Sequence, residues 1–217
     1  MKRKIMDTLV KWREKENSRL PLLLSGARQV GKTYVMRELG AECFKSTVYV
    51  NFEADRKIGS YFETDIHAET IIGILEKYYQ TKIIPDETLI IFDEIQMCER
   101  ALTSLKYFAE EAPEYPVIAA GSLLGVALKR EQFSFPVGKI QMESMYPMDF
   151  EEFLWAKGKE ILAETIRAHF ENNRPVDEMI HKEALFEYNN YCIIGGMPAA
   201  VLAEITSSAT LSQQEIR

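Results

Sequence analysis

Residues 26–33 carry the clearest chemical pattern in the chain. They read Gly-Ala-Arg-Gln-Val-Gly-Lys-Thr, which is a glycine, four residues, a second glycine, a lysine and a threonine. This spacing is typical of a phosphate-binding loop, because glycines let backbone N–H groups turn inward toward anionic oxygens. In such a loop Lys32 reaches the outer phosphates and the Thr33 hydroxyl is a ligand for Mg²⁺. We therefore expect the nucleotide-binding residues to be Gly26, Ala27, Arg28, Gln29, Val30, Gly31, Lys32, Thr33 and Tyr34.

A second pattern lies in residues 89–94, where an apolar run ends in Asp93 and Glu94. In a parallel α/β sheet, ligands collect at the carboxyl ends of the strands. We therefore expect Asp93 to hold Mg²⁺ beside the loop, together with Thr33. Glu94 is then placed to deprotonate the attacking water, and a general base of this kind contributes about 10²–10⁴ in rate. The alternative is an ordinary strand end followed by a solvated acidic turn.

A third apolar run, residues 117–122, ends in Gly121 and Ser122. The Ser122 hydroxyl is a candidate catalytic group that would contact the terminal phosphate or the attacking water. A Gly-Ser turn after a strand is also common without any such role.

Strand and helix signals alternate along the first two thirds of the chain. Apolar, β-rich runs predict strands at residues 20–25, 47–52, 88–92, 116–120 and 138–143. Apolar residues spaced three and four apart predict helices at residues 2–16, 33–39, 68–79 and 101–111. This alternation predicts an α/β domain with a parallel sheet covered on both faces. From residue 149 onward the signal is helical, so we expect one domain at residues 1–147 and a helical subdomain at residues 148–217.

The composition is that of a globular protein. The 217 residues are 47% hydrophobic and 11% aromatic, which suffices for a core and excludes a disordered or disulfide-stapled chain. The net charge of −7 excludes a globally basic nucleic-acid surface, although not a local basic patch. Three scattered cysteines predict free thiols, and no apolar run approaches the roughly 20 residues of a membrane span. We therefore expect a cytoplasmic protein that does not bind membranes.

Together these motifs resemble those of the AAA+ ATPases. Residues 26–33 resemble the Walker A motif, residues 89–94 the Walker B motif with its catalytic glutamate, and residues 118–122 the sensor 1 strand. Further segments are similar to a prokaryotic subgroup, named only as ATP-binding proteins, whose members carry a C-terminal domain of unknown function. These segments are DEIQ at residues 93–96, GSLLGVAL at 121–128, FPVGKIQMESMYPMDFEEFL at 135–154 and IIGGMPAAV at 193–201.

The resemblance implies a P-loop fold of the ASCE type, with a five-stranded sheet between helices. The sensor strand would lie between the Walker A and Walker B strands, and ATP and Mg²⁺ would be the ligands. A small helical or winged-helix-like lid would follow. The chain ends soon after the Gly-Gly-Met-Pro segment at residues 195–198, so we expect it to lack the C-terminal domain and to carry a truncated lid. That segment predicts a tight turn ahead of a helix, or alternatively a lid contact to the nucleotide.

The identity of a phosphate-sensing arginine stays open. Many relatives have Gly-Arg where this chain has Gly138 and Lys139, and lysine cannot make the forked contact of arginine with a phosphate. Arg28, Arg100 and Arg130 are the alternatives, each with a solvated surface role as the competing interpretation. Glu53 and Asp55 follow the second strand, where they either line the site or form a solvated strand end.

Two functions follow from these patterns. The first is an ATPase that uses hydrolysis to drive a conformational cycle. The second is a nucleotide-gated switch or scaffold, with little turnover, that regulates an attached C-terminal effector domain or a partner protein. The paired Asp93 and Glu94 favour the ATPase, and the lack of an Asn-Lys-x-Asp motif disfavours a GTPase. The expected ligands are ATP and ADP. A homo-oligomer or a partner protein stays open, and a link to DNA rests on analogy alone.

Overall fold

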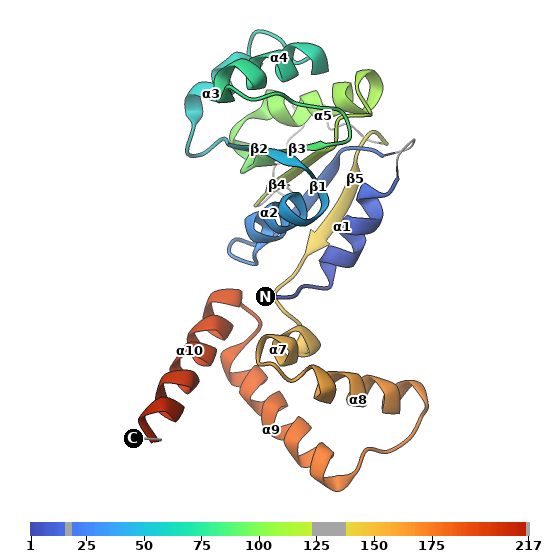
Figure 1. Cartoon of the computed structure of the whole chain (residues 1–217), viewed down its shortest axis with the longest axis vertical. Helices are drawn as coiled ribbons and strands as arrows, with labels where there is room; N and C mark the ends of the chain where they lie inside the picture. The colour runs from blue at the N-terminus through green and yellow to red at the C-terminus, as the bar shows by residue number, and fades with distance from the viewer. Residues whose placement is uncertain (16–18, 123–137, 216–217) are drawn as a thin grey trace. The chain divides into compact units, whose positions relative to one another are not determined.

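The computed structural model describes residues 1–15, 19–122 and 138–215. Within these residues the chain forms two compact units (Figure 1). The larger unit is Ile5–Met145, and the smaller one combines Met1–Lys4 with Tyr146–Arg217. No helix in the described part of the chain is both long enough and apolar enough to cross a lipid bilayer.

The larger unit is built on a five-stranded sheet in which all neighbouring strands run parallel. The spatial order is β2-β3-β4-β1-β5. β3 and β4 are buried along their whole length, as expected for a sheet that is covered on both faces. β4, whose sequence resembles a sensor 1 strand, lies between β1 and β3, as the resemblance implied. The strands are β1 Leu22–Gly26, β2 Ser46–Asn51, β3 Thr88–Asp93, β4 Val117–Gly121 and β5 Gln141–Met145.

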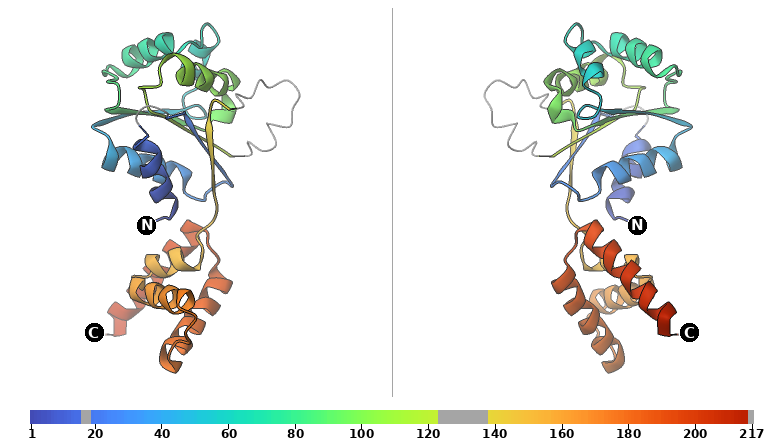
Figure 2. Two further views of the ribbon diagram at one scale, coloured as in Figure 1. Left: turned by 90° about the vertical axis from the view of Figure 1, so that its right-hand side faces the viewer. Right: turned by 90° about the vertical axis from the view of Figure 1, so that its left-hand side faces the viewer.

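Helices cover both faces of this sheet (Figure 2). One face carries α1 packed against α2, and the other carries α3 and α4 packed against α5. Side chains alternate between the faces of a strand, so Ile90 and Phe92 enter the core beneath α4 and α5. The helices are α1 Ile5–Arg13, α2 Lys32–Cys43, α3 Arg56–Phe62, α4 Ala68–Tyr79 and α5 Glu99–Glu111, with a 3-10 turn, η1, at Ile95–Met97.

A cluster of phenylalanine rings fixes the end of β3. The Phe92 ring centroid lies 5.5 Å from that of Phe52, 5.8 Å from that of Phe62 and 6.2 Å from that of Phe108, all edge to face. Such pairs add about 0.5–1.5 kcal/mol each beyond the burial of their area. Phe92 immediately precedes Asp93, so this packing determines where the acidic strand end lies.

The described residues of the smaller unit form helices and no strand. They are α7 Phe150–Ala156, α8 Glu160–Glu171, α9 Glu178–Ile194 and α10 Pro198–Glu215. Two small apolar cores hold them together, one around Phe153 and Val201 and one around Leu154 and Leu162. α10 begins at Pro198, three residues after Gly195, which has a φ of 78°. The Gly-Gly-Met-Pro segment is therefore the predicted tight turn ahead of a helix.

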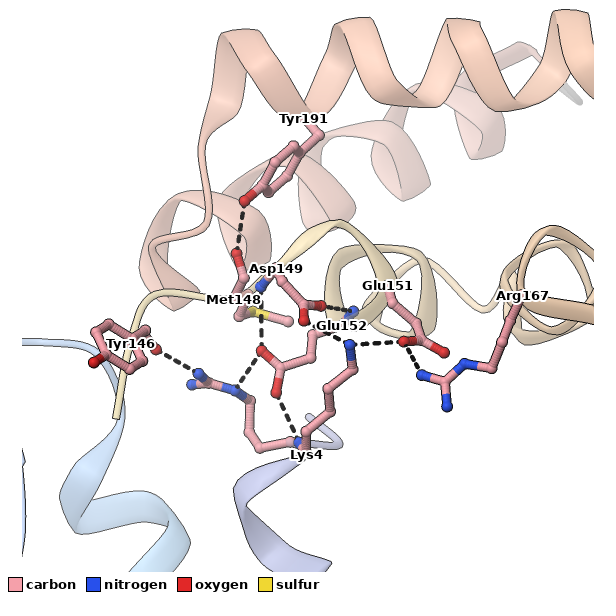
Figure 3. Close-up of polar contacts among 9 residues, drawn as sticks. Lys4, Tyr146, Met148, Asp149, Glu151, Glu152, Arg167 and Tyr191 are labelled. Carbon is pink, nitrogen blue, oxygen red and sulfur yellow. Dashed lines mark hydrogen bonds and ion pairs between the residues drawn. The ribbon is translucent and has the colours of Figure 1, made fainter. Parts of the chain in front are cut away.

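The first four residues of the chain belong to the smaller unit. Figure 3 shows the polar contacts that Lys4 makes there. Arg3 donates to the Tyr146 carbonyl at 2.7 Å and forms an ion pair with Glu152 at 3.2 Å. Lys4 Nζ lies 2.6 Å from a carboxylate oxygen of Asp149 and 2.7 Å from one of Glu151. Residues 1–147 were expected to form one domain, so this placement of Met1–Lys4 was not foreseen. It depends on ion pairs that span more than 140 positions in the sequence.

We expect Gly196→Ala to destabilise the smaller unit. A Cβ atom at Gly196 would lie 2.0 Å from the Met148 carbonyl oxygen, and Met148 N–H donates to the Gly196 carbonyl at 2.7 Å. The backbones must separate to relieve this clash, which we expect to cost about 2 kcal/mol or more. Urea unfolding measures the change. Gly73→Ala in α4 is the matched control, because a Cβ atom there meets nothing within 4 Å. Equal unfolding midpoints for wild type and Gly196→Ala would contradict the expected clash.

Candidate functional site

The loop between β1 and α2 adopts the curled backbone that the glycine spacing predicted. Gly26, Gln29 and Gly31 have φ values of 154°, 65° and 100°, a range that favours glycine. A Cβ atom at Gly26 would lie 2.2 Å from the Met145 carbonyl oxygen, so this position also requires a glycine for space. Gly31 is the N-cap of α2, so the loop leads directly into a helix N-terminus. Unpaired N–H groups at such a terminus bind anions.

Lys32 is folded back over this loop. Its Nζ donates to the carbonyl of Gly26 at 2.9 Å and to that of Ala27 at 2.7 Å, and the residue is buried. Burial lowers the pKa of Lys32, while the negative charges of Glu94 and Asp93 act in the opposite direction. The ammonium of Lys32 thus lies between the β1–α2 loop and the acidic end of β3.

Asp93 joins the loop to the end of β3. The Thr33 hydroxyl donates to its Oδ2 at 2.7 Å, as expected for two residues that would share a metal ion. The Tyr49 hydroxyl donates to the same oxygen at 2.7 Å, and the Glu94 N–H donates to Oδ1 at 3.0 Å. The Asp93 carboxylate is therefore held from three sides and is almost completely buried.

Tyr49 is a site residue that sequence analysis missed. It lies on β2, the strand next to β3, and the guanidinium of Arg37 lies 4.0 Å from its ring centroid. Burial raises the pKa of Tyr49, and its hydrogen bond to Asp93 adds to the rise. The phenol therefore stays a hydrogen-bond donor to Asp93 at neutral pH. Nothing in the local sequence marks this residue, because the contact depends on the pairing of β2 with β3.

Glu94 directly follows Asp93 and has an unusual backbone conformation. Its φ of 51° and ψ of 43° are left-handed, which is strained for a residue other than glycine. The side-chain amide of Gln96 donates to the Glu94 carboxylate and lies 3.4 Å from Ser122 Oγ. Arg28 Nε also lies 3.4 Å from Ser122 Oγ. These four side chains form a chain of polar contacts from the loop to Glu94.

A cleft of about 410 Å³ lies over the loop. Most of the expected nucleotide-binding residues line it, together with Glu94, while Val30 is buried in the core. Asp93 and Ser122 are buried beside the cleft and do not line it. The lining residues are Arg28, Gln29, Gly31, Lys32, Thr33, Tyr34, Glu53 and Glu94. Asp55 is elsewhere, since it caps α3 through the Ile58 N–H at 3.2 Å and accepts from the Tyr78 hydroxyl at 2.8 Å.

The structure separates the arginine candidates. Arg28 lines the cleft, whereas Arg100 Nε donates to the Phe62 carbonyl at 2.7 Å in a different groove. Lys139 forms an ion pair with Glu110 at 3.1 Å. Arg130 lies outside the described residues. Of the candidates that the structure describes, Arg28 alone reaches the cleft.

Sheet order, loop and strand-end carboxylates together define the fold of the P-loop AAA+ ATPases. The chain belongs to the AAA domain family, whose sequence profile matches residues 18–154. No curated protein matches the sequence.

Solved structures with the same fold include AMPPCP-bound DnaA from Aquifex aeolicus. It is 14% identical, with a TM-score of 0.51, over 92% of this chain and 58% of DnaA. PCH-2 from C. elegans is 10% identical, with a TM-score of 0.44, over 83% of this chain and 50% of PCH-2. Cdc6p from Pyrobaculum aerophilum is 15% identical, with a TM-score of 0.43, over 72% of this chain and 46% of Cdc6p. This chain thus spans about half the length of each of these proteins.

Proposed function

We propose that this chain binds Mg·ATP in the cleft over the loop and hydrolyses it to drive a conformational cycle. The observation that carries this proposal is the hydrogen bond of 2.7 Å between Thr33 and Asp93. It brings the phosphate-binding loop and the acidic end of β3 together, with Glu94 lining the same cleft. Membership of the AAA domain family supports the same ligand class.

The proposed roles follow from the chemistry of each group. Backbone N–H groups of the loop bind the phosphates, and Lys32 releases its two carbonyls to pair with the outer phosphates. Thr33 and Asp93 would hold Mg²⁺, and this donor set fits, since Mg²⁺ prefers a few oxygen ligands and keeps several waters. The ion neutralises phosphate charge when bound. Glu94 takes a proton from the attacking water while the water oxygen bonds to the γ phosphorus. The bond between the γ phosphorus and the β–γ bridging oxygen breaks, and ADP leaves. The Ser122 hydroxyl lies 3.4 Å from both Arg28 Nε and Gln96 Nε2 and would contact the terminal phosphate or the attacking water.

The smaller unit supports a second candidate, a nucleotide-gated switch with little turnover. Several of its large apolar side chains are more than three-quarters exposed, namely Ile161, Phe170, Met179 and Ile193. Apolar side chains exposed to this extent would gain free energy if a partner protein or a further copy of the chain covered them. In this second function, residues 148–217 act as a lid that becomes ordered when nucleotide binds. The partner protein or attached domain responds to that ordering.

The proposed setting is the reducing cytoplasm. Cys43, Cys98 and Cys192 are all free thiols, which suits that compartment.

The test of the proposed function is ATP binding and phosphate release by the purified chain, with and without Mg²⁺. We expect phosphate release that requires Mg²⁺ and nearly one bound adenine nucleotide per chain. GTP in place of ATP is the control for nucleotide preference. Binding of Mg·ATP with no phosphate release would favour the switch, and absence of binding would contradict both functions.

A further inference from the structure

Gln96 contacts the proposed catalytic base without lining the cleft itself. It lies in the 3-10 turn η1 directly after β3, two residues beyond Glu94. Its side-chain Nε2 donates to Oε2 of Glu94, a contact between the two side chains of a single turn. The reverse orientation of the amide would place its carbonyl oxygen against the carboxylate, and two acceptors repel each other. The NH₂ group is therefore the end that faces Glu94.

The same amide nitrogen connects Glu94 to the sensor strand. It lies 3.4 Å from Ser122 Oγ, and Ser122 directly follows β4. Ser122 Oγ in turn lies 3.4 Å from Arg28 Nε in the loop. Both nitrogens are donors, so the serine oxygen is the acceptor of both contacts and its own hydrogen is left able to donate. The Gln96 amide thus joins Glu94 to Ser122, and the Ser122 hydroxyl continues the contact to Arg28 in the loop.

The other end of the Gln96 amide is not satisfied. Its Oε1 is buried and has no hydrogen-bond partner in the described part of the chain. A buried acceptor without a partner lowers the stability of the fold. The contacts of the NH₂ group with Glu94 and Ser122 are thus made at a cost in folding free energy. Glu94, which this amide contacts, has a strained left-handed backbone conformation. Backbone strain of this kind is typical of functional sites.

We propose that Gln96 is a positioning residue for the hydrolysis described above, an inference that rests on the proposed function. Its amide orients the Glu94 carboxylate and ties it to Ser122, so that a phosphate contacting Ser122 or Arg28 changes how Glu94 is held. Gln96 acts through Glu94 and does not itself bind the nucleotide, because it is absent from the lining of the cleft.

The test compares Gln96→Leu and Gln96→Glu with wild type. Leucine has a similar volume without the amide, and glutamate has the same shape but places a carboxylate against that of Glu94. We expect kcat for Mg·ATP to fall at least about tenfold in both variants, a part of the 10²–10⁴ that a general base contributes. We expect KM and the Kd for ATP to stay within about twofold of wild type. A merely structural role would weaken nucleotide binding as well.

The same substitution in a Glu94→Gln background decides whether Gln96 acts through Glu94. We expect Gln96→Leu to change the residual turnover less than about twofold there, because coupled residues are not additive. An equal fold-loss in both backgrounds, or an unchanged kcat in the single variants, would overturn the role of Gln96 while leaving the ATPase intact. A wild-type chain that binds ATP without turnover would instead overturn the proposed hydrolysis, and this inference with it.

Discussion

Glu94→Gln is expected to bind Mg·ATP as tightly as wild type and to hydrolyse it at least about 100-fold more slowly. Glutamine has the same shape as glutamate, and its carbonyl oxygen can still accept the hydrogen bond from Gln96. It cannot take a proton from water, so the general-base contribution of about 10²–10⁴ is lost. A residue that acts only in the transition state lowers kcat without raising KM.

Single-turnover hydrolysis and the Kd for ATP, measured on the same samples, test this expectation. Glu53→Gln is the matched comparison, since it removes a carboxylate that lines the same cleft but does not contact Gln96. A similar loss in both variants would assign the effect to the charge of the cleft and not to a base. Turnover by Glu94→Gln equal to that of wild type would remove Glu94 from the chemistry.

The features of the fold and the site that the local sequence predicted are those that depend on neighbouring residues. Residues 26–33 are consecutive, and their glycines determine the backbone that the structure confirms. The helix expected at residues 68–79 has those bounds because one apolar face, with Ile71 and Leu75 in the core, marks its whole length. The position of β4 between β1 and β3 came from the resemblance and is confirmed by the strand order.

The parts that could not be read depend on contacts between distant residues. Tyr49 reaches Asp93 because β2 pairs with β3 in a register that places Asn51 opposite Asp93. The last strand was expected at residues 138–143 but lies at Gln141–Met145. Its register is determined by pairing with β1 from Leu22 to Gly26, while its own alternating polar residues resemble many loops. No local sequence pattern predicts the pairing of β2 with β3 or of β1 with β5.

Lys32→Ala is expected to weaken binding of Mg·ATP at least about 100-fold. The lysine provides the positive charge that lies between the loop and the carboxylates of Asp93 and Glu94. Without it, the phosphates would face those carboxylates, with the loop N–H groups and the guanidinium of Arg28, which lines the same cleft, as the remaining compensation. Loss of a charge-assisted hydrogen bond to phosphate removes the electrostatic attraction and also the contact that orients the phosphate.

The empty protein should tolerate this change. Burial lowers the pKa of Lys32, against the opposing charges of Glu94 and Asp93, so folding disfavours its charged form relative to the unfolded chain. A lowered folded-state pKa means a charge penalty that is fully present at neutral pH and is relieved only as the pH rises toward the titration of lysine. Removing the amine therefore removes a cost together with two hydrogen bonds to loop carbonyls. We expect similar unfolding midpoints for wild type and variant without nucleotide.

Thermal unfolding with and without Mg·ATP separates binding from folding. A ligand at 100 times its Kd stabilises the wild type by about 2.7 kcal/mol, and the Lys32→Ala variant should gain almost nothing at the same concentration. Lys45→Ala is the control, because that side chain is 75% exposed and lies outside the cleft. Unchanged ATP affinity in Lys32→Ala would contradict the assignment of the loop as the phosphate site. A loss of hydrolysis at saturating Mg·ATP, beyond the loss of affinity, would show that Lys32 also stabilises the charge that develops in the transition state.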